Sequence, residues 1–179
     1  MTSKRMTCMT LAALLSAPPT TVASRVHDDA LTVPPAYLRV AEEYEVPAGI
    51  LFAIALTESG RTTDGRFLPW PWTLNVDGRG EYYASRAEAD ARLRELIDQG
   101  KMPDIGLMQV NWRYHSSKLG DPEQAFNPWL NLRAGARVLR QEYESTGDWW
   151  QAVGRYHSRT PSRAQAYRQR VLRWYRRLG

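Results

Sequence analysis

Cysteine and histidine are scarce in this chain of 179 residues, which contains one cysteine and three histidines. With Cys8 as its lone thiol, the chain cannot close a disulfide within itself, so folding does not depend on redox help. His27, His115 and His157 are far apart and show none of the spacings typical of metal sites. Glycine-rich phosphate loops and dinucleotide fingerprints are absent as well. We therefore expect neither a metal nor an organic cofactor.

Apolar runs long enough to span a membrane are missing too, although a shorter apolar stretch lies near the start. Lys4 and Arg5 precede the apolar segment 6–17, and the small residues of 21–23 follow it. This order is typical of a signal peptide, which we predict over residues 1–23; the apolar segment is too short to span a bilayer. An uncleaved N-terminal anchor is the alternative. No other segment is apolar enough to cross a membrane, so we expect an exported protein of the periplasm or cell envelope.

Acidic residues are absent from segment 154–179, which contains eight arginines, and the formal net charge of the chain is +5. A basic end predicts an anionic partner: a cell-wall polymer, a lipid surface or a nucleic acid. No nucleic-acid-reading motif is present, and the signal peptide argues against that partner, so we expect no nucleic acid. The plainer alternative is an amphipathic helix whose solvated face is rich in arginine.

Residues 34–179 are expected to form one domain after a short linker at 26–33, since 43% of the chain is hydrophobic. Strands 73–76 and 81–83 flank a hairpin-turn dipeptide, Asp77-Gly78. The other periodic segments follow proline or polar caps and predict helices. These helices are expected at about 34–45, 47–58, 85–99, 106–114, 128–145, 149–157 and 161–178, with 61–72 irregular.

Glu58 follows the most apolar segment of the domain, Ile50–Leu56. Low dielectric disfavours a charged carboxylate, so such a group stays protonated near neutral pH and can give its proton to a leaving oxygen. The alternative is a solvated glutamate at a helix end that Gly60 stops. Most glycosidases need a second carboxylate, but none nearby has an equally apolar context. The nearest acidic residues in the sequence are Asp64, Asp77, Glu81, Asp98 and Asp104.

Four short motifs follow one another in a recognisable order. They are Glu58-Ser59, Gly-Leu-Met-Gln at 106–109, Asn-Pro-x-x-Asn-x-x-x-Gly at 127–135, and a turn that contains Tyr156. This order resembles the soluble lytic transglycosylase family, relatives of goose-type lysozyme, over residues 34–158. The family usually has Ala-Tyr-Asn-x-Gly in the last motif, whereas this chain keeps the tyrosine and replaces the asparagine with His157.

The resemblance implies a mainly α, lysozyme-like single domain with a small β-hairpin beside the catalytic cleft. It implies a peptidoglycan lytic transglycosylase that cleaves the β-1,4 bond between N-acetylmuramic acid and N-acetylglucosamine and leaves a 1,6-anhydro end. Glu58 is then the single catalytic residue, first as acid and then as base, with the substrate's N-acetyl group assisting. The implied partners are peptidoglycan strands and an envelope-spanning conjugation or secretion machine.

The resemblance also implies substrate contacts from Ser59, Met108, Gln109 and Tyr156. The Gln109 amide suits an N-acetyl group or a sugar hydroxyl, and Met108 offers an adaptable apolar surface. Tyr156 is expected to bond the Glu58 carboxyl or to pack beneath it. The alternatives are that Met108 lies in the core, that Gln109 bonds only local backbone, and that Tyr156 is a core tyrosine with a solvated hydroxyl.

Two further sets of residues have simpler expected roles. Asn127, Asn131 and Gly135 are expected to be architectural, with Gly135 allowing another helix to approach. Three tryptophans are candidates for stacking on sugar rings, although core packing is the more frequent fate of tryptophan. They are Trp70, Trp72 and Trp112.

Two other functions remain open from the sequence. A lysozyme-type muramidase would cut the same bond by hydrolysis, and its product would carry a reducing end in place of the anhydro end. A non-catalytic wall-binding subunit of a conjugation or secretion apparatus would need no acid, and the presence of Glu58 argues against it.

Overall fold

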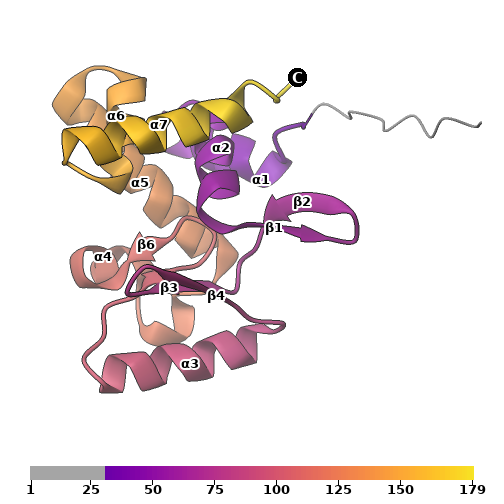
Figure 1. The fold of residues 1–179 in the computed structure, drawn as a ribbon, viewed down its shortest axis with the longest axis vertical. Helices are drawn as coiled ribbons and strands as arrows, with labels where there is room; N and C mark the ends of the chain where they lie inside the picture. Colours follow the sequence, from indigo (N-terminus) through magenta and orange to yellow (C-terminus); the bar gives the residue numbers. More distant parts are fainter. Residues whose placement is uncertain (1–30) are drawn as a thin grey trace, which may run out of the picture.

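The computed structural model describes residues 31–179, in which seven α-helices pack with small antiparallel sheets (Figure 1). The helices are α1 Pro35–Glu43, α2 Ala48–Ser59, α3 Arg86–Asp98, α4 Trp112–Leu119, α5 Pro128–Thr146, α6 Trp149–His157 and α7 Pro161–Tyr175. The strands are β1 Gly60–Thr63, β2 Arg66–Pro69, β3 Thr73–Val76, β4 Arg79–Tyr82, β5 Asp104–Ile105 and β6 Val110–Asn111. The predicted mainly α, lysozyme-like class is confirmed. The signal peptide predicted for residues 1–23 lies outside the described residues.

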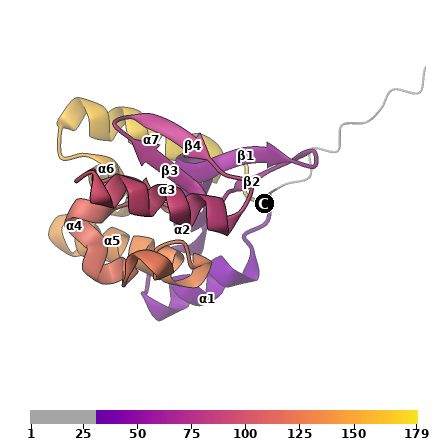
Figure 2. The ribbon, with the colours of Figure 1, turned by 90° about the horizontal axis from the view of Figure 1, so that it is seen from below.

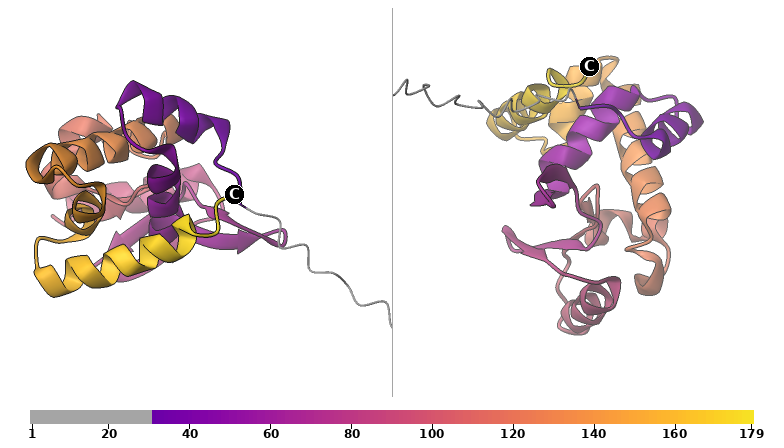
Figure 3. Two further views of the ribbon diagram at one scale, coloured as in Figure 1. Left: turned by 90° about the horizontal axis from the view of Figure 1, so that it is seen from above. Right: turned by 90° about the vertical axis from the view of Figure 1, so that its right-hand side faces the viewer.

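Helix α2 is the centre of the fold. Every residue of Ile50–Leu56 is buried, because α1, α5, α7 and β2 all pack around this helix. Figure 3 shows α2 running between α1, α5 and α7. Pro47 precedes its first turn, where a missing N–H costs nothing. The helix ends at Ser59, where the chain passes into the β part, so Glu58 stands at the border between the two parts of the molecule.

The second part is a four-stranded sheet in the order β4-β3-β5-β6, with α3 packed beneath it (Figures 1 and 2). The predicted hairpin is present, with β3 paired to β4 around Asp77-Gly78. The cap predicted for α3 is present as well, since the Ser85 hydroxyl accepts a hydrogen bond from the Glu88 N–H.

The expectation of an irregular segment at 61–72 was wrong. Strands β1 and β2 form a second hairpin there, with Gly60 opposite Pro69. Its turn is Asp64-Gly65, whose φ angles of 50° and 74° belong to the left-handed region that hairpin turns use. The Phe67 ring stacks on Trp174 of α7 at 4.5 Å, which anchors the hairpin to the helical part.

The prediction of a helix at 106–114 was also wrong. Strands β5 and β6 pair around a tight turn, and α4 begins only at Trp112. Gly106 has a φ of 76°, and a Cβ added to it would lie 2.5 Å from the Asn131 Nδ2 atom. Gln109 is also left-handed, with a φ of 45°. A continuous helix cannot contain these backbone angles. Tertiary contacts with α5 hold the turn in this conformation.

Asn131 is the contact that holds this turn. Its side-chain oxygen accepts from the Met108 N–H at 2.9 Å, and its amide donates to the carbonyls of Ile105 at 2.8 Å and Ala125 at 3.3 Å. Gly135, one turn along α5, faces the Met108 side chain; a Cβ there would lie 2.6 Å from it. Gly135 therefore admits a side chain of the turn and not the second helix that we expected.

The linker expected at 26–33 is ordered at its end. Leu31 pairs with Leu178 as an isolated parallel bridge, and its N–H donates to the Arg177 carbonyl at 3.1 Å. Leu31 and Val33 also pack on the core. The start of the described chain is thus joined to its end beside α7.

Replacing Asn131 with alanine should destabilise the domain strongly. Three buried hydrogen bonds are lost, and their backbone partners remain unsatisfied, so the free energy of unfolding should fall by about 3 kcal/mol. Asn127 serves as the control, because it caps α5 at a more exposed position and Asn127→Ala should cost only about 1 kcal/mol. Urea denaturation of both variants measures the difference, and equal losses would contradict this role for Asn131.

Candidate active site

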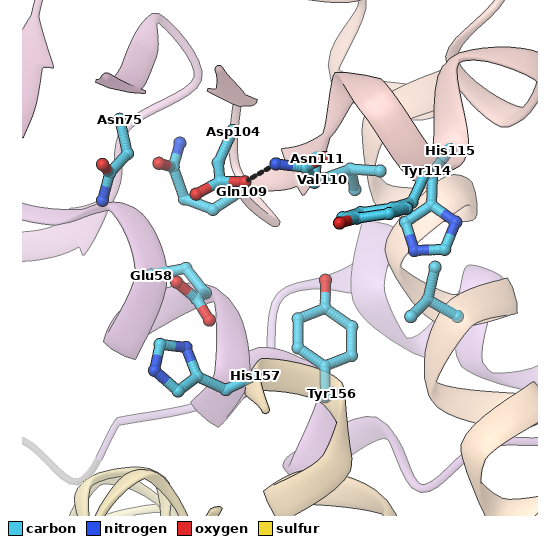
Figure 4. Close-up of a pocket in the computed structure, with 11 residues that line it drawn as sticks. Glu58, Asn75, Asp104, Gln109, Val110, Asn111, Tyr114, His115, Tyr156 and His157 are labelled. Carbon is cyan, nitrogen blue, oxygen red and sulfur yellow. Dashed lines mark hydrogen bonds between the residues drawn. The ribbon is translucent and has the colours of Figure 1, made fainter. Parts of the chain in front are cut away.

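A cleft of about 270 Å³ separates the end of α2 from the sheet (Figure 4). Eleven residues from both parts of the molecule line it, and most of them carry polar groups. They are Glu58, Asn75, Asp104, Gln109, Val110, Asn111, Tyr114, His115, Val138, Tyr156 and His157. Asn75 comes from β3, so the predicted hairpin does form one wall of the cleft.

Glu58 is partly buried in this cleft, in the last turn of α2. The pKa of its carboxyl is raised to about 7, mainly by burial and to a lesser extent by the nearby Asp104. A hydrogen bond from Tyr167 and the positive charge of Arg170 act in the opposite direction and lower the same pKa. The elevated pKa expected from the apolar sequence context is therefore found, and the carboxyl keeps a large protonated fraction at neutral pH.

Tyr167 of α7 holds the Glu58 carboxyl, a contact that the sequence did not predict. The Tyr167 hydroxyl donates to Glu58 Oε1 at 2.5 Å, and the ring is almost fully buried. Tyr156 was expected in this role. Its hydroxyl instead donates to the Met108 carbonyl at 2.7 Å while its side chain lines the cleft. The sequence analysis offered an amphipathic helix for this segment, but it did not single out Tyr167 or indicate its partner.

The four residues expected to contact substrate lie in different places. The Ser59 hydroxyl is fully buried and donates to the Leu107 carbonyl at 2.8 Å, and the Met108 side chain is fully buried in the core. Neither is among the residues that line the cleft, so the structure gives no support to these two expected contacts. Gln109 and Tyr156 do line the cleft.

Gln109 bonds nearby backbone and also lines the cleft. Its side-chain amide donates to the carbonyls of Gly106 at 2.9 Å and Thr73 at 3.2 Å, which fixes the side chain across the turn. The same residue lines the cleft opposite Glu58 (Figure 4). Because the amide nitrogen is engaged with backbone, the carbonyl oxygen is the group best suited to meet a substrate hydroxyl or N–H.

Asp104 is the second carboxylate that the sequence analysis did not find. It lines the same cleft, and burial raises the pKa of its carboxyl. The Asn111 amide donates to Asp104 Oδ1 at 2.7 Å and lowers that pKa. Its sequence context gave no apolar signature, because Asp104 on β5 is brought to Asn111 on β6 only in the folded chain.

None of the three candidate tryptophans is among the residues that line this cleft. Trp70 and Trp72 pack edge to face at 5.2 Å, and Trp70 donates its indole N–H to the Tyr83 carbonyl at 2.7 Å. Trp112 and Trp72 pack against the hydrophobic core. Core packing therefore accounts for Trp72 and Trp112.

Metal clusters and membrane-spanning helices are both absent from residues 31–179. No three His, Cys, Asp or Glu side chains come together there in a way that could hold a metal ion. In the same part of the chain, every helix is too short or too polar to cross a bilayer.

Comparison with known proteins finds a matching family model and relatives of low identity. The family model for the transglycosylase SLT domain matches residues 79–171, more than half of the chain. Protein IpgF of Shigella sonnei and protein IpgF of Shigella flexneri are each 25% identical to the chain over 150 residues, which is 79% of this chain and 79% of theirs. No solved structure gives a significant match. The family match begins after Glu58, so the position of that residue rests on the structure.

Glu58→Gln should stabilise the protein in alkaline solution and leave its stability almost unchanged at pH 4. The folded-state pKa of Glu58 lies above the ordinary value of 4.5, so wild-type stability is full below pH 4.5 and is lost as pH rises through about 7. The neutral amide avoids this loss, which we expect to be about 2 kcal/mol at pH 9 after allowing for partial exposure. Thermal or urea unfolding at both pH values measures it.

Glu81→Gln is the matched control, because hydrogen bonds and charge from Arg92 lower the pKa of Glu81 overall against the opposing effect of burial. Its effect on stability above pH 5 should have the opposite sign. A Glu58→Gln protein whose stability difference from wild type is the same at pH 4 and pH 9 would contradict a buried, protonated carboxyl.

Proposed function

Because the chain belongs to the transglycosylase SLT family, we propose that it is an exported peptidoglycan lytic transglycosylase with Glu58 as its single catalytic residue. The family supports action on peptidoglycan. The observation that carries the finer proposal is one carboxyl at the cleft, protonated near neutral pH by burial and held in place by a tyrosine. The proposed bond is the β-1,4 link between N-acetylmuramic acid and N-acetylglucosamine, and a role beside a conjugation or secretion machine stays a prediction.

The proposed reaction returns Glu58 to its starting state. The protonated carboxyl gives its proton to the glycosidic oxygen, the C1–O bond breaks, and the substrate's N-acetyl oxygen stabilises the positive charge at C1. The Glu58 carboxylate then takes the proton of the C6 hydroxyl of the same sugar. The C6 oxygen bonds to C1 and closes the 1,6-anhydro ring. No water is consumed, and each proton that leaves Glu58 is replaced.

The residues around Glu58 suit this sequence of steps. Tyr167 limits rotation of the carboxyl, which must reach first the glycosidic oxygen and then the C6 hydroxyl. Asn75 and Gln109 line the opposite side and offer amide groups for an N-acetyl group. Tyr156 bonds the Met108 carbonyl and so joins the floor of the cleft to the helical part.

Asp104 favours one alternative, a muramidase that cuts the same bond with water. A carboxylate in the same cleft as the acid is the group that activates water or supports positive charge in two-carboxylate glycosidases. Its bond to Asn111 weakens this option, because that bond occupies one carboxylate oxygen and lowers the pKa of Asp104. We therefore rank hydrolysis second.

Mass spectrometry of the sugars released from purified sacculi decides between the two reactions. We expect anhydro-muramyl ends from wild-type protein. We expect a loss of at least about 100-fold in rate for Glu58→Gln, because an amide cannot supply the proton. Asp104→Asn is the matched carboxyl-to-amide control and should retain anhydro products. Reducing ends that disappear in Asp104→Asn would establish the muramidase, and a fully active, folded Glu58→Gln protein would rule out both.

Tyr167→Phe should move the alkaline limb of the pH–rate profile to higher pH. The hydroxyl lowers the Glu58 pKa, so its removal leaves burial less opposed, and the acid form persists above pH 7. The maximum rate should fall about tenfold or more because the carboxyl is less well positioned. Tyr156→Phe is the control: its hydroxyl bonds the Met108 carbonyl and not Glu58, so its limb should stay near pH 7. Equal limbs in both variants would contradict this assignment.

A further inference from the structure

His157 stands where the family usually has asparagine, and the contacts of its side chain indicate a role for this replacement. The imidazole lines the cleft at the last residue of α6, beside Glu58 (Figure 4). It also lies flat on the Tyr167 ring, with the ring centroids 4.6 Å apart and the planes at 5°. Since the Tyr167 hydroxyl donates to Glu58, the three side chains form one contact series, His157, Tyr167 and Glu58.

Basic side chains of α7 lie beside this contact series. The guanidinium of Arg170 lies 5.2 Å from the centroid of the Tyr167 ring. Partial desolvation, and then the charges of Arg170 and Arg163 on α7, lower the pKa of His157, although the residue is exposed. The acidic groups that line the same cleft are the carboxyls of Glu58, which accepts a hydrogen bond from Tyr167, and Asp104, which accepts one from Asn111. The cleft also holds His115 from α4, whose pKa is lowered too, and Tyr156 from α6.

We propose that His157 is a positioning residue that acts through Tyr167: the neutral imidazole holds the tyrosine on Glu58, and its protonation switches the catalytic carboxyl off. The inference rests on the proposed function. A neutral imidazole can stack face to face on a phenol ring at no electrostatic cost. An imidazolium at the same place is repelled by the positive charges of Arg163 and Arg170, so protonation weakens the stack and releases Tyr167, and with it the carboxyl, from the geometry that proton transfer needs.

Glu58 and His157 therefore titrate in the reverse of the order that the isolated side chains follow. An isolated histidine titrates near 6.5 and an isolated glutamate near 4.3. In this cleft partial desolvation lowers the histidine's pKa and burial raises that of Glu58 to about 7, so there is an interval of pH in which both are neutral. Activity is expected only within that interval.

An acid limb in the pH–rate profile is the distinguishing consequence. A single-glutamate mechanism loses its acid only at high pH, because the carboxylate required for the second step is produced by the first. A fall in rate toward low pH therefore requires another titrating group. Of the candidates in the cleft, Asp104 is bonded to Asn111, and His115 lies 3.1 Å from the Lys118 ammonium. Of these three cleft residues, His157 is the one that stacks on the tyrosine that holds Glu58.

The test measures kcat and KM from pH 4.5 to 9 for wild type, His157→Asn and His115→Asn, with soluble glycan fragments as substrate. Wild type should lose about tenfold in kcat per pH unit below the His157 midpoint. His157→Asn, which restores the residue usual in the family, should lose this acid limb and keep the alkaline limb near pH 7, with kcat changed more than KM. His115→Asn should retain the acid limb. A limb that persists in His157→Asn, or that vanishes in His115→Asn, overturns the proposal.

A second measurement does not depend on activity. The carboxyl ¹³C signal of Glu58 is followed by NMR across the same pH range in wild type and in His157→Asn. We expect two inflections in wild type, one of them at the pH at which the His157 ring titrates, and a single inflection in the variant. One inflection in both proteins overturns the inference even if cleavage is never detected. Two inflections in a protein that cuts no glycan would leave the contact series standing and remove the proposed function.

Discussion

The hydrogen bond between Glu58 and Tyr167 is the contact on which the organisation of the site depends. It joins the end of α2, the most buried helix, to α7, the last helix of the chain. Burial of Ile50–Leu56 gives the carboxyl an apolar base that raises its pKa, while the phenol supplies the only strong polar partner found for it among residues 31–179. A group that is costly to ionise and fixed in orientation is suited to proton transfer.

The opposite wall depends on α5 in a comparable way. Asn131 satisfies the backbone of the turn between β5 and β6, and Gly106 and Gly135 have no side chain because Asn131 and Met108 occupy that space. The turn in turn presents Gln109 and Asp104 to the cleft. The two walls meet where the Tyr156 hydroxyl bonds the Met108 carbonyl. Substitutions in α5 should therefore change the site although that helix contributes only Val138 to its lining.

Helix α7 combines a packing face with a charged face. Tyr167 and Val171 are buried, whereas most of the arginines of 154–179 are exposed. Among residues 31–179, one ion pair involves these eight arginines, between Arg159 and Glu142. The basic charge is thus largely uncompensated by the protein itself. This agrees with the predicted attraction to an anionic envelope polymer, and it also places Arg163 and Arg170 where they bias the titration of His157.

The sequence by itself determined the helices other than α4, because proline, serine, asparagine and aspartate caps act within one turn of the residues they affect. It also determined that Glu58 is an unusual carboxylate, since its apolar context lies within the same helix. The short strands 60–69 and 104–111 were missed, because left-handed turns at Asp64-Gly65 and Gly106 interrupt patterns too short to show a period. Only the tertiary structure decided which side chains meet in the cleft. Tyr167 lies 109 residues from Glu58, and periodicity reports which face of a helix is buried but not which distant residue it is buried against.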